Sequence, residues 1–359
     1  MPHELSFAEN GEAEMFYVGP EPWHRRGQKL DGPATAREAI EAAHLDWTVE
    51  LQPIYRGGTD GSMNVVPDRY AIVRTDNQKM FDIVSSDYEI VQNVENFDLF
   101  EGVIGQGQAV YHTAGALRDG RVVFILAKLP DTIEVVKNDP IEKFILLSTS
   151  HDRTKSLEMA ITPIRVVCMN TLRVAMARAR HRIKIKHTSG LFDRAVEARE
   201  ALQLTDAYYQ IMMEGIDRLA RTPMRTRDME EYASAFLNVN PDKPEMNRNT
   251  AAAHDQLCDL FETGRGQDIA GVRGTAYAAF NATTEFVDNY GLVKVDSDIR
   301  QDSEIAQDLR MYRSWFGRGQ ERRNTGWTML QNYSASGLSA FQNTYQPRER
   351  GPQRTVIAA

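Results

Sequence analysis

Alternating cations over residues 178–187 constrain the fold of this chain more than any other feature, because the alternation has a period of two. In a helix the cations would be separated by steps of about 200° and would share no face. In a strand they all point to one side, about 6.6 Å apart, and the residues between them point to the other. The sequence therefore predicts a strand with one cationic face, made of Arg178, Arg180, Arg182, Lys184 and Lys186.

This strand lies near the end of a window without carboxylates. Residues 159–192 contain seven Lys and Arg residues and no Asp or Glu, whereas the chain of 359 residues has 42 basic and 50 acidic residues and a net charge of −8. The rest of the chain is therefore strongly acidic, which argues against indiscriminate binding to phosphates. One cationic strip on an acidic body indicates a focused site for an anion.

A row of evenly spaced cations suits a polyanion that is followed along its backbone, and single-stranded nucleic acid is the first candidate. The alternative is an exposed edge strand whose charges prevent edge-to-edge aggregation. Five cations with no acid among them exceed what edge protection needs, so we favour nucleic-acid binding. The predicted phosphate contacts are the strand cations Arg178, Arg180, Arg182, Lys184 and Lys186, with Arg153, Arg165 and Arg173 nearby.

Hydrophobic patterning predicts an α+β fold: an antiparallel sheet of hairpins packed against long helices, with a helical C-terminal region. Expected strands are 47–55, 68–75 and 80–84, then hairpins 109–117/122–129, turning at Asp119-Gly120, and 144–149/155–162. Expected helices are 36–43, capped by Thr35, 93–105, 191–219, 228–237, capped by Thr226, 250–262, 275–289 and 303–316.

Composition shifts divide the chain into four parts. Residues 1–35 are expected to be an irregular leader and 36–237 an α+β core domain that holds the basic strand. The proline-containing loop 238–248 opens a helical C-terminal region that runs to residue 345, and 346–359 are expected to be a flexible tail. No apolar run approaches the roughly 20 residues that span a bilayer, and the N-terminus lacks a secretion signal, so we expect a cytoplasmic protein without membrane contact.

Three motifs have competing interpretations. Ser150, His151 and Asp152 are consecutive and cannot assume the geometry of a catalytic triad, so we expect a hydrogen-bonded turn from which His151 and Arg153 approach a phosphate. Asn170 is interpreted as the N-cap of a helix. The segment 310–327, rich in arginine and aromatic residues, fits a subunit interface or single-strand binding, which we favour slightly over ordinary helix packing.

Other motifs argue against an enzyme. The glycines of residues 102–107 lack the spacing and the following lysine of a nucleotide-binding loop. The two cysteines, Cys168 and Cys258, match no zinc-ligand spacing, and no carboxylate cluster indicates a metal. We therefore expect no cofactor, and a metal-independent enzyme centred on His151 and Asp152 is the least favoured hypothesis.

Several short motifs together resemble the phage/plasmid-like family of unknown function, which occurs in phages, prophages and conjugative plasmids. The resemblance covers roughly residues 15–330, and Arg322-Arg323 depart from it where a lysine is expected nearby. The matching motifs are Pro22-Trp23-His24, Tyr70 to Arg74 with Asp76, Tyr88 to Asn93, Thr113-Ala114-Gly115, Gly120-Arg121, Ser150-His151-Asp152, Arg165 to Cys168 with Asn170-Thr171-Leu172, His187-Thr188, Gly274 to Tyr277, Asn281-Ala282, Thr284-Glu285 and Phe316-Gly317.

The resemblance implies a setting in mobile elements and no particular reaction. The order of helix and hairpins around the basic strand is also similar to the core of single-strand annealing proteins, an analogy at the level of fold alone. We therefore expect a homo-oligomeric protein that binds single-stranded DNA and promotes annealing or recombination without nucleotide hydrolysis. The alternative is a phage-encoded host-interaction or anti-defence protein that acts by binding a protein.

Overall fold

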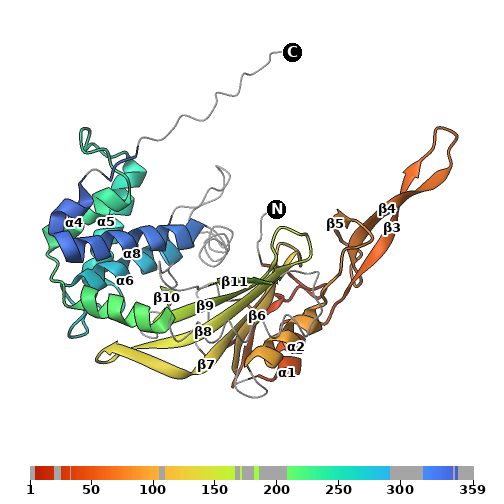
Figure 1. Ribbon diagram of the computed structural model, residues 1–359, viewed down its shortest axis with the longest axis horizontal. Helices are drawn as coiled ribbons and strands as arrows, with labels where there is room; N and C mark the ends of the chain where they lie inside the picture. The colour runs from red at the N-terminus through yellow and green to blue at the C-terminus, as the bar shows by residue number, and fades with distance from the viewer. Residues whose placement is uncertain are drawn as a thin grey trace, which may run out of the picture.

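The computed structural model describes residues 5–19, 26–32, 34–104, 110–165, 170–171, 182–185, 208–291, 318–342 and 344–346. It consists of a sheet lobe, a helical lobe beside it and a long β-hairpin that projects away from both (Figure 1). The predicted class, an antiparallel-rich sheet with helices and a helical C-terminal region, is confirmed.

An eight-stranded sheet forms the first lobe, and its centre is a meander of four antiparallel strands. These strands are β6 (Val110–Leu117), β7 (Val122–Val136), β8 (Asp139–Ser150) and β9 (Leu157–Arg165). The strand order is β10-β9-β8-β7-β6-β1-β2, and β11 (Arg182–Ile185) also pairs with β9. The predicted hairpins are thus present, with β7 and β8 longer than expected.

The expected irregular leader is wrong for two segments. β1 (Met15–Val18) pairs antiparallel with β6, and β2 (Gln28–Leu30) runs parallel to β1. Both strands are too short to show a recognisable alternation, and pairing in the sheet, of β1 with β6 and of β2 with β1, fixes them rather than intrinsic propensity. Trp23 and His24 lie outside the described residues.

Two helices cover one face of this sheet. Helix α1 (Ala36–Ala42) begins at a capping box, in which Thr35 accepts a hydrogen bond from the backbone of Glu38 and the Glu38 side chain bonds back. Helix α2 (Asn93–Ile104) lies beside it (Figure 1). Phe97 and Phe100 of α2 are fully buried in the same apolar cluster as β7 residues such as Ile125.

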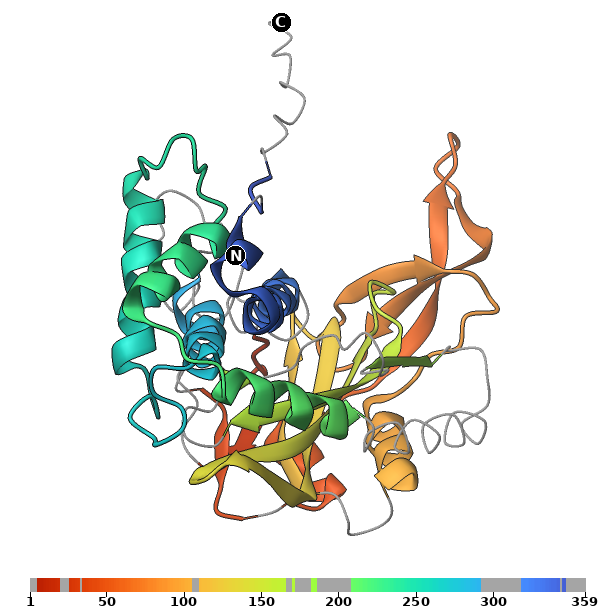
Figure 2. The ribbon, with the colours of Figure 1, turned by 60° about the vertical axis from the view of Figure 1, so that its left-hand side comes forward.

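The projecting hairpin belongs to a separate three-stranded sheet. Its strands are β3 (Val49–Gly57), β4 (Met63–Arg74) and β5 (Met80–Val84), and β5 covers only the base of β4. We call residues 53–69, beyond this base, the arm; it extends clear of the sheet lobe in both ribbon views (Figures 1 and 2).

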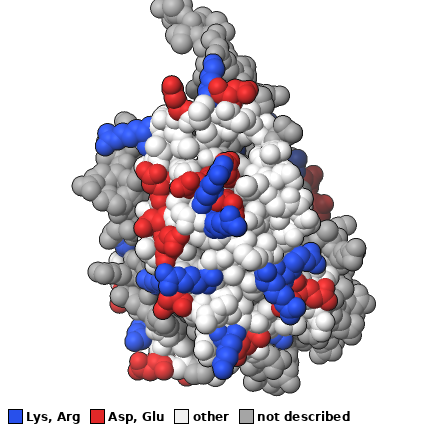
Figure 3. Space-filling model, turned by 90° about the vertical axis from the view of Figure 1, so that its left-hand side faces the viewer, with Lys and Arg blue, Asp and Glu red and all other residues white. Residues whose placement is uncertain are grey.

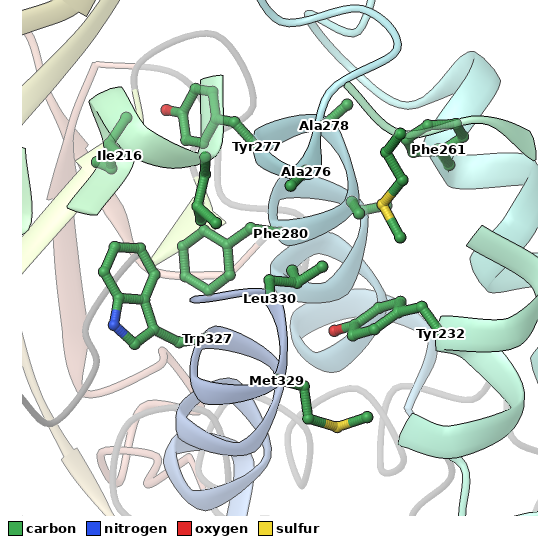
Figure 4. Packing of buried hydrophobic residues seen from close by; sticks show 14 of the residues in the cluster. Ile216, Tyr232, Phe261, Ala276, Tyr277, Ala278, Phe280, Trp327, Met329 and Leu330 are labelled. Atoms are coloured by element: carbon green, nitrogen blue, oxygen red, sulfur yellow. The ribbon is translucent and has the colours of Figure 1, made fainter. Parts of the chain in front are cut away.

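The helical lobe contains residues 208–220, α4 (Thr226–Phe236), α5 (Arg248–Thr263), α6 (Ala276–Glu285), a π-helical turn η1 (Phe286–Tyr290), α8 (Arg318–Ser336) and η2 (Gly337–Phe341). Helix α6 is buried along its whole length, because α5 and α8 pack against it. Figure 4 shows its Phe280 against Trp327 of α8, and the two rings meet edge to face at 5.0 Å.

One apolar cluster unites this lobe with the sheet. It includes Tyr208, Met212 and Ile216, which the sequence places before residue 238, together with Ile133 and Ile141 from the distal part of the β7–β8 hairpin. The helical core therefore begins well before the proline-containing loop. Residues 191–207 and 303–316 of the expected helices lie outside the described residues.

Two local predictions in this lobe are wrong. Thr226 is the first residue of α4 rather than its cap; the side chain of Asp228 accepts a hydrogen bond from the backbone of Arg225 instead. Helix α8 was not predicted. Its glycines and its two successive arginines obscure the apolar period, although Trp327, Leu330 and other side chains are buried.

Replacing Gly326 by Ala tests how closely α8 packs on α6. A Cβ there would lie 2.7 Å from the Tyr232 hydroxyl and 2.8 Å from a Thr283 methyl. We expect a loss of about 1–2 kcal/mol in the free energy of unfolding, because overpacking outweighs the better helix propensity of Ala. Denaturant titration measures it. Gly57→Ala, at a position with open space, should change stability by less than about 0.5 kcal/mol; an equal effect would contradict the packing argument.

Candidate nucleic-acid interface

The predicted cationic strand is present over the four residues that the structure describes. β11 pairs antiparallel with β9, and its register sets Arg182 opposite Ala160 and Lys184 opposite Glu158. Ile183 and Ile185 take the positions opposite Met159 and Leu157, both buried in the main core. Directly paired residues share a face of a sheet, so Arg182 and Lys184 belong to one register series and Ile183 and Ile185 to the other; Ala160, opposite Arg182, is buried as well. Arg173, Arg178, Arg180 and Lys186 lie outside the described residues.

Arg165 does not belong to the series of β9 residues that pairs with the cations of β11. Along β9, Arg165 belongs to the same alternating series as Leu157, Met159 and Ile161. Arg182 and Lys184 pair with Ala160 and Glu158, which belong to the other series. No irregularity interrupts β9 between these positions. By backbone register, Arg165 therefore belongs to the other series of β9 from the residues that pair with the cations of β11.

Asn170 is not the N-cap of a helix. Asn170 and Thr171 form the short strand β10, which pairs with Arg165 and Ile164 at the far end of β9. β10 and β11 thus add to the same edge of β9, β10 near its C-terminal end and β11 near its start. Pairing in the sheet replaces the capping role that the residue type suggests.

The tip of the β8–β9 hairpin is the expected hydrogen-bonded turn. Ser150 Oγ accepts a hydrogen bond from the backbone N–H of Lys155 at 2.8 Å and donates one to its carbonyl at 3.0 Å. Asp152 accepts from the backbone of Thr154 at 3.1 Å. Each side chain is thus engaged locally, and the three consecutive residues do not form a nucleophile–base–acid chain.

His151 points into the protein and does not approach a phosphate at the tip. Its side chain is buried, its Nε2 lies 3.0 Å from Asn93 Oδ1, and its ring stacks on Phe81 and meets Trp47 edge to face. The space beside it, lined by Tyr88 and other side chains, has no room for a water molecule. His151 therefore holds the hairpin tip against α2 and the base of the arm.

Arg153 is exposed, but it has an acidic neighbour. It extends from a left-handed turn position, with φ of 58°, to within 3.8 Å of Asp82 on β5. Two other cations also have acidic neighbours: Arg118 lies 3.8 Å from Asp152, and Lys79 lies 3.4 Å from Asp119. The hairpin tip is thus a mixed surface. Arg165 is the last of the nine residues of β9, about 26 Å from the first, so these two predicted contacts are far apart.

A buried cation that the sequence analysis did not single out joins the arm to the main sheet. Arg74, at the end of β4, is almost fully buried, forms two 2.7 Å hydrogen bonds with Asp76 and one with Glu14 beside β1, and lies 4.1 Å over the Trp47 ring. Gly120, with φ of 90°, leaves room for it, because a Cβ there would lie 2.8 Å from the guanidinium. Arg74 and Asp76 are both part of the family motif Tyr70 to Arg74 with Asp76, and this motif is the sequence signal that could have identified them.

The two carboxyl groups of this cluster respond differently to their surroundings. Burial raises the pKa of Glu14 above its usual range, and the charge and hydrogen bond of Arg74 offset only part of this effect. Burial acts on Asp76 in the same direction, but the hydrogen bonds and charge of Arg74 outweigh it, so the pKa of Asp76 is lowered. The surroundings therefore favour the ionised form of Asp76 more than that of Glu14.

The lowered pKa of Asp76 predicts pH-dependent stability. The ion pair stabilises the fold above the unfolded pKa of about 3.9, and this contribution is lost as the pH falls through the lower folded pKa. Asp76→Asn should cost up to about 1 kcal/mol at pH 7, since Asp76 is partly exposed, and much less near pH 3. Denaturant titrations at the two pH values measure the difference.

Asp119→Asn is the matched control, because it removes a carboxylate from an ion pair in which both side chains are more than half exposed. It should change stability by less than about 0.5 kcal/mol at pH 7. Equal costs of Asp76→Asn at pH 7 and pH 3 would mean that ionisation of Asp76 contributes nothing to the fold.

Two described residues of the C-terminal stretch, Arg323 and Trp327, belong to the core and cannot form the expected interface. Arg323 is fully buried and pairs with Asp288 of η1, and Trp327 is buried against Phe280. Arg322 stacks over the rings of Phe236 and Phe286. Arg323 and Trp327 are therefore not available to a strand or to another subunit, whereas Arg322 is partly exposed.

The described residues offer little for metal or thiol chemistry. Within them, no group of three or more His, Cys, Asp and Glu side chains could hold a metal ion. Burial, with the charges of Glu230 and Asp255, raises the pKa of the half-buried Cys258 to about 11, which makes it a poor nucleophile. In the same part of the chain, none of the helices has the length and apolar character needed to cross a bilayer.

Comparison with known proteins places most of this architecture in one family. Residues 80–331 match the family described as a domain of unknown function (DUF932). The chain belongs to this family. The DUF932 region begins at β5 and ends within α8, so it contains the hairpin tip and β11 but not β3 and β4. No curated protein and no solved structure matches the chain.

Proposed function

We propose that this DUF932 protein binds single-stranded nucleic acid, DNA in preference, and promotes strand annealing or recombination without nucleotide hydrolysis. It would act as a homo-oligomer in the cytoplasm of the host of a phage or other mobile element. The observation that carries the proposal is the strand β11, because a period-two row of cations forms one face only in strand geometry.

The position of β11 also suits a long polyanion. Among the described strands, β11 pairs only with β9, so its other edge is not covered by a described strand. Successive cations about 6.6 Å apart match an extended strand of phosphates better than a compact anion. Annealing needs phosphates held and bases left exposed, which a row of point charges provides without a catalytic group.

Glu158 sets a limit on the strength of this contact. It lies opposite Lys184 in the β9–β11 register, although it is just outside the acid-free window of the sequence. A carboxylate directly across from a cation competes with phosphate for it. We therefore expect moderate affinity that depends strongly on ionic strength.

Charge reversal tests the proposal. A labelled oligonucleotide should bind the wild-type protein at low salt in a gel-shift assay. The logarithm of the binding constant should fall linearly with the logarithm of the salt concentration, because phosphate contacts release counterions. The variant with Arg180, Arg182 and Lys184 replaced by Glu should bind at least about tenfold more weakly, with a shallower salt slope. The same proteins should differ in an annealing assay with complementary strands.

The control variant replaces the exposed Arg37, Lys243 and Arg248 by Glu and thus makes the same change in net charge outside β11. It should bind within about twofold of wild type. Equal binding by the two variants, or no binding by wild-type protein at low salt, would refute the proposal.

A second candidate is a phage-encoded host-interaction protein that acts by binding a protein. The acidic excess favours it, and on the side of the helical lobe the described cations and acids are interspersed rather than separated (Figure 3). Pull-down of a host protein that survives nuclease treatment, together with absence of oligonucleotide binding, would select this candidate.

A further inference from the structure

The arm carries an apolar face that is exposed among the residues that the structure describes. β3 and β4 pair Tyr55 with Val65 and Gly57 with Met63, and paired residues share a face. The side chains of Tyr55, Met63 and Val65 are 51%, 68% and 53% exposed. A projecting two-stranded ribbon is marginally stable in water without further packing. We therefore expect another molecule to pack against the exposed face.

The charges of the arm indicate which occupant fits. From tip to base they are Asp60, Arg56, Asp68 and Arg69, so the arm is neutral although the whole chain has a net charge of −8. Two arms that lie antiparallel about a two-fold axis bring Asp60 at the tip of each beside Arg69 at the base of the other, whereas Arg56 pairs with Asn64 and by register belongs to the face opposite Tyr55 and Val65. Two parallel arms bring like charges together. The order of charges is thus complementary to itself in one orientation only.

Nucleic acid fits this surface less well. The described charges of the arm include as many acids as cations, and its exposed face consists of aliphatic side chains beside a single tyrosine. Single-strand binding surfaces combine an excess of cations with several stacking rings. The arm lacks that combination, whereas an apolar face with a polar rim is typical of an interface between proteins.

We propose that the arm is a self-association surface, on which a second copy of this chain packs its own arm in antiparallel orientation. Tyr55, Met63 and Val65 of each copy form the apolar centre, and Asp60 of each lies at the Arg69 of the other. This inference deepens the oligomeric part of the proposed function, but its test contains no nucleic acid, so failure of one is distinguishable from failure of the other.

Sedimentation velocity over a concentration series tests the apolar centre. Wild-type protein should form a dimer or a larger assembly built on it, and the variant Tyr55→Ser, Met63→Ser, Val65→Thr should dissociate at least about tenfold more readily. The control Val94→Thr, Tyr290→Ser, Leu338→Ser removes comparably exposed apolar side chains elsewhere and should assemble as wild type does. Circular dichroism checks that both variants are folded.

A double-mutant cycle tests the orientation. Asp60→Asn keeps the turn in which Asp60 accepts hydrogen bonds from Ser62, and Arg69→Gln removes the opposite charge. Each single variant should weaken association by about three- to tenfold, and the double variant should be no weaker than the singles. Monomeric wild-type protein, equal dissociation of arm and control variants, or additive effects of Asp60→Asn and Arg69→Gln would overturn the proposal.

Discussion

The hairpin of β7 and β8 is the element on which the rest of the structure depends, because all three apolar clusters include its residues. One face of its proximal half, with Ile125 and Leu147, packs under α1 and α2, and the other face, with Phe124 and Leu146, packs under the N-terminal segment. Its distal half inserts Ile133 into the helical lobe. A single hairpin buried on both faces thus fixes two lobes in one fold.

The arm is attached to this framework through electrostatics as well as packing. Isolated burial of a guanidinium is costly, so Arg74 is stable only because Asp76 and Glu14 surround it. Glu14 belongs to the N-terminal segment and Asp76 to the turn after β4. The cluster therefore ties the N-terminal segment to the end of β4, and it positions the base of a hairpin whose distal part is exposed.

Local rules of sequence predicted much of this fold. The capping box of α1, the turn at Asp119-Gly120 and the apolar run of β7 each specify structure within a few residues. Register is different, because it depends on pairing across the sheet. The sequence predicts Arg165 near β11, but it cannot show that Arg165 belongs to the other register series of β9. It also cannot show that Glu158 pairs with Lys184. The same limit hid β1, β2 and the buried role of Arg323.

The two proposed contacts have opposite dependence on salt. The proposed phosphate binding along β11 would be driven by counterion release and would weaken steeply as salt rises. Association through Tyr55, Met63 and Val65 removes apolar surface from water, which salt does not screen, and only the rim pairs of Asp60 and Arg69 are weakened. At moderate salt the chain should therefore remain assembled while it releases the strand. Assembly would then precede binding rather than follow it, and an oligomer would present several cationic strands to one polyanion, so that individually moderate contacts add up to tight binding.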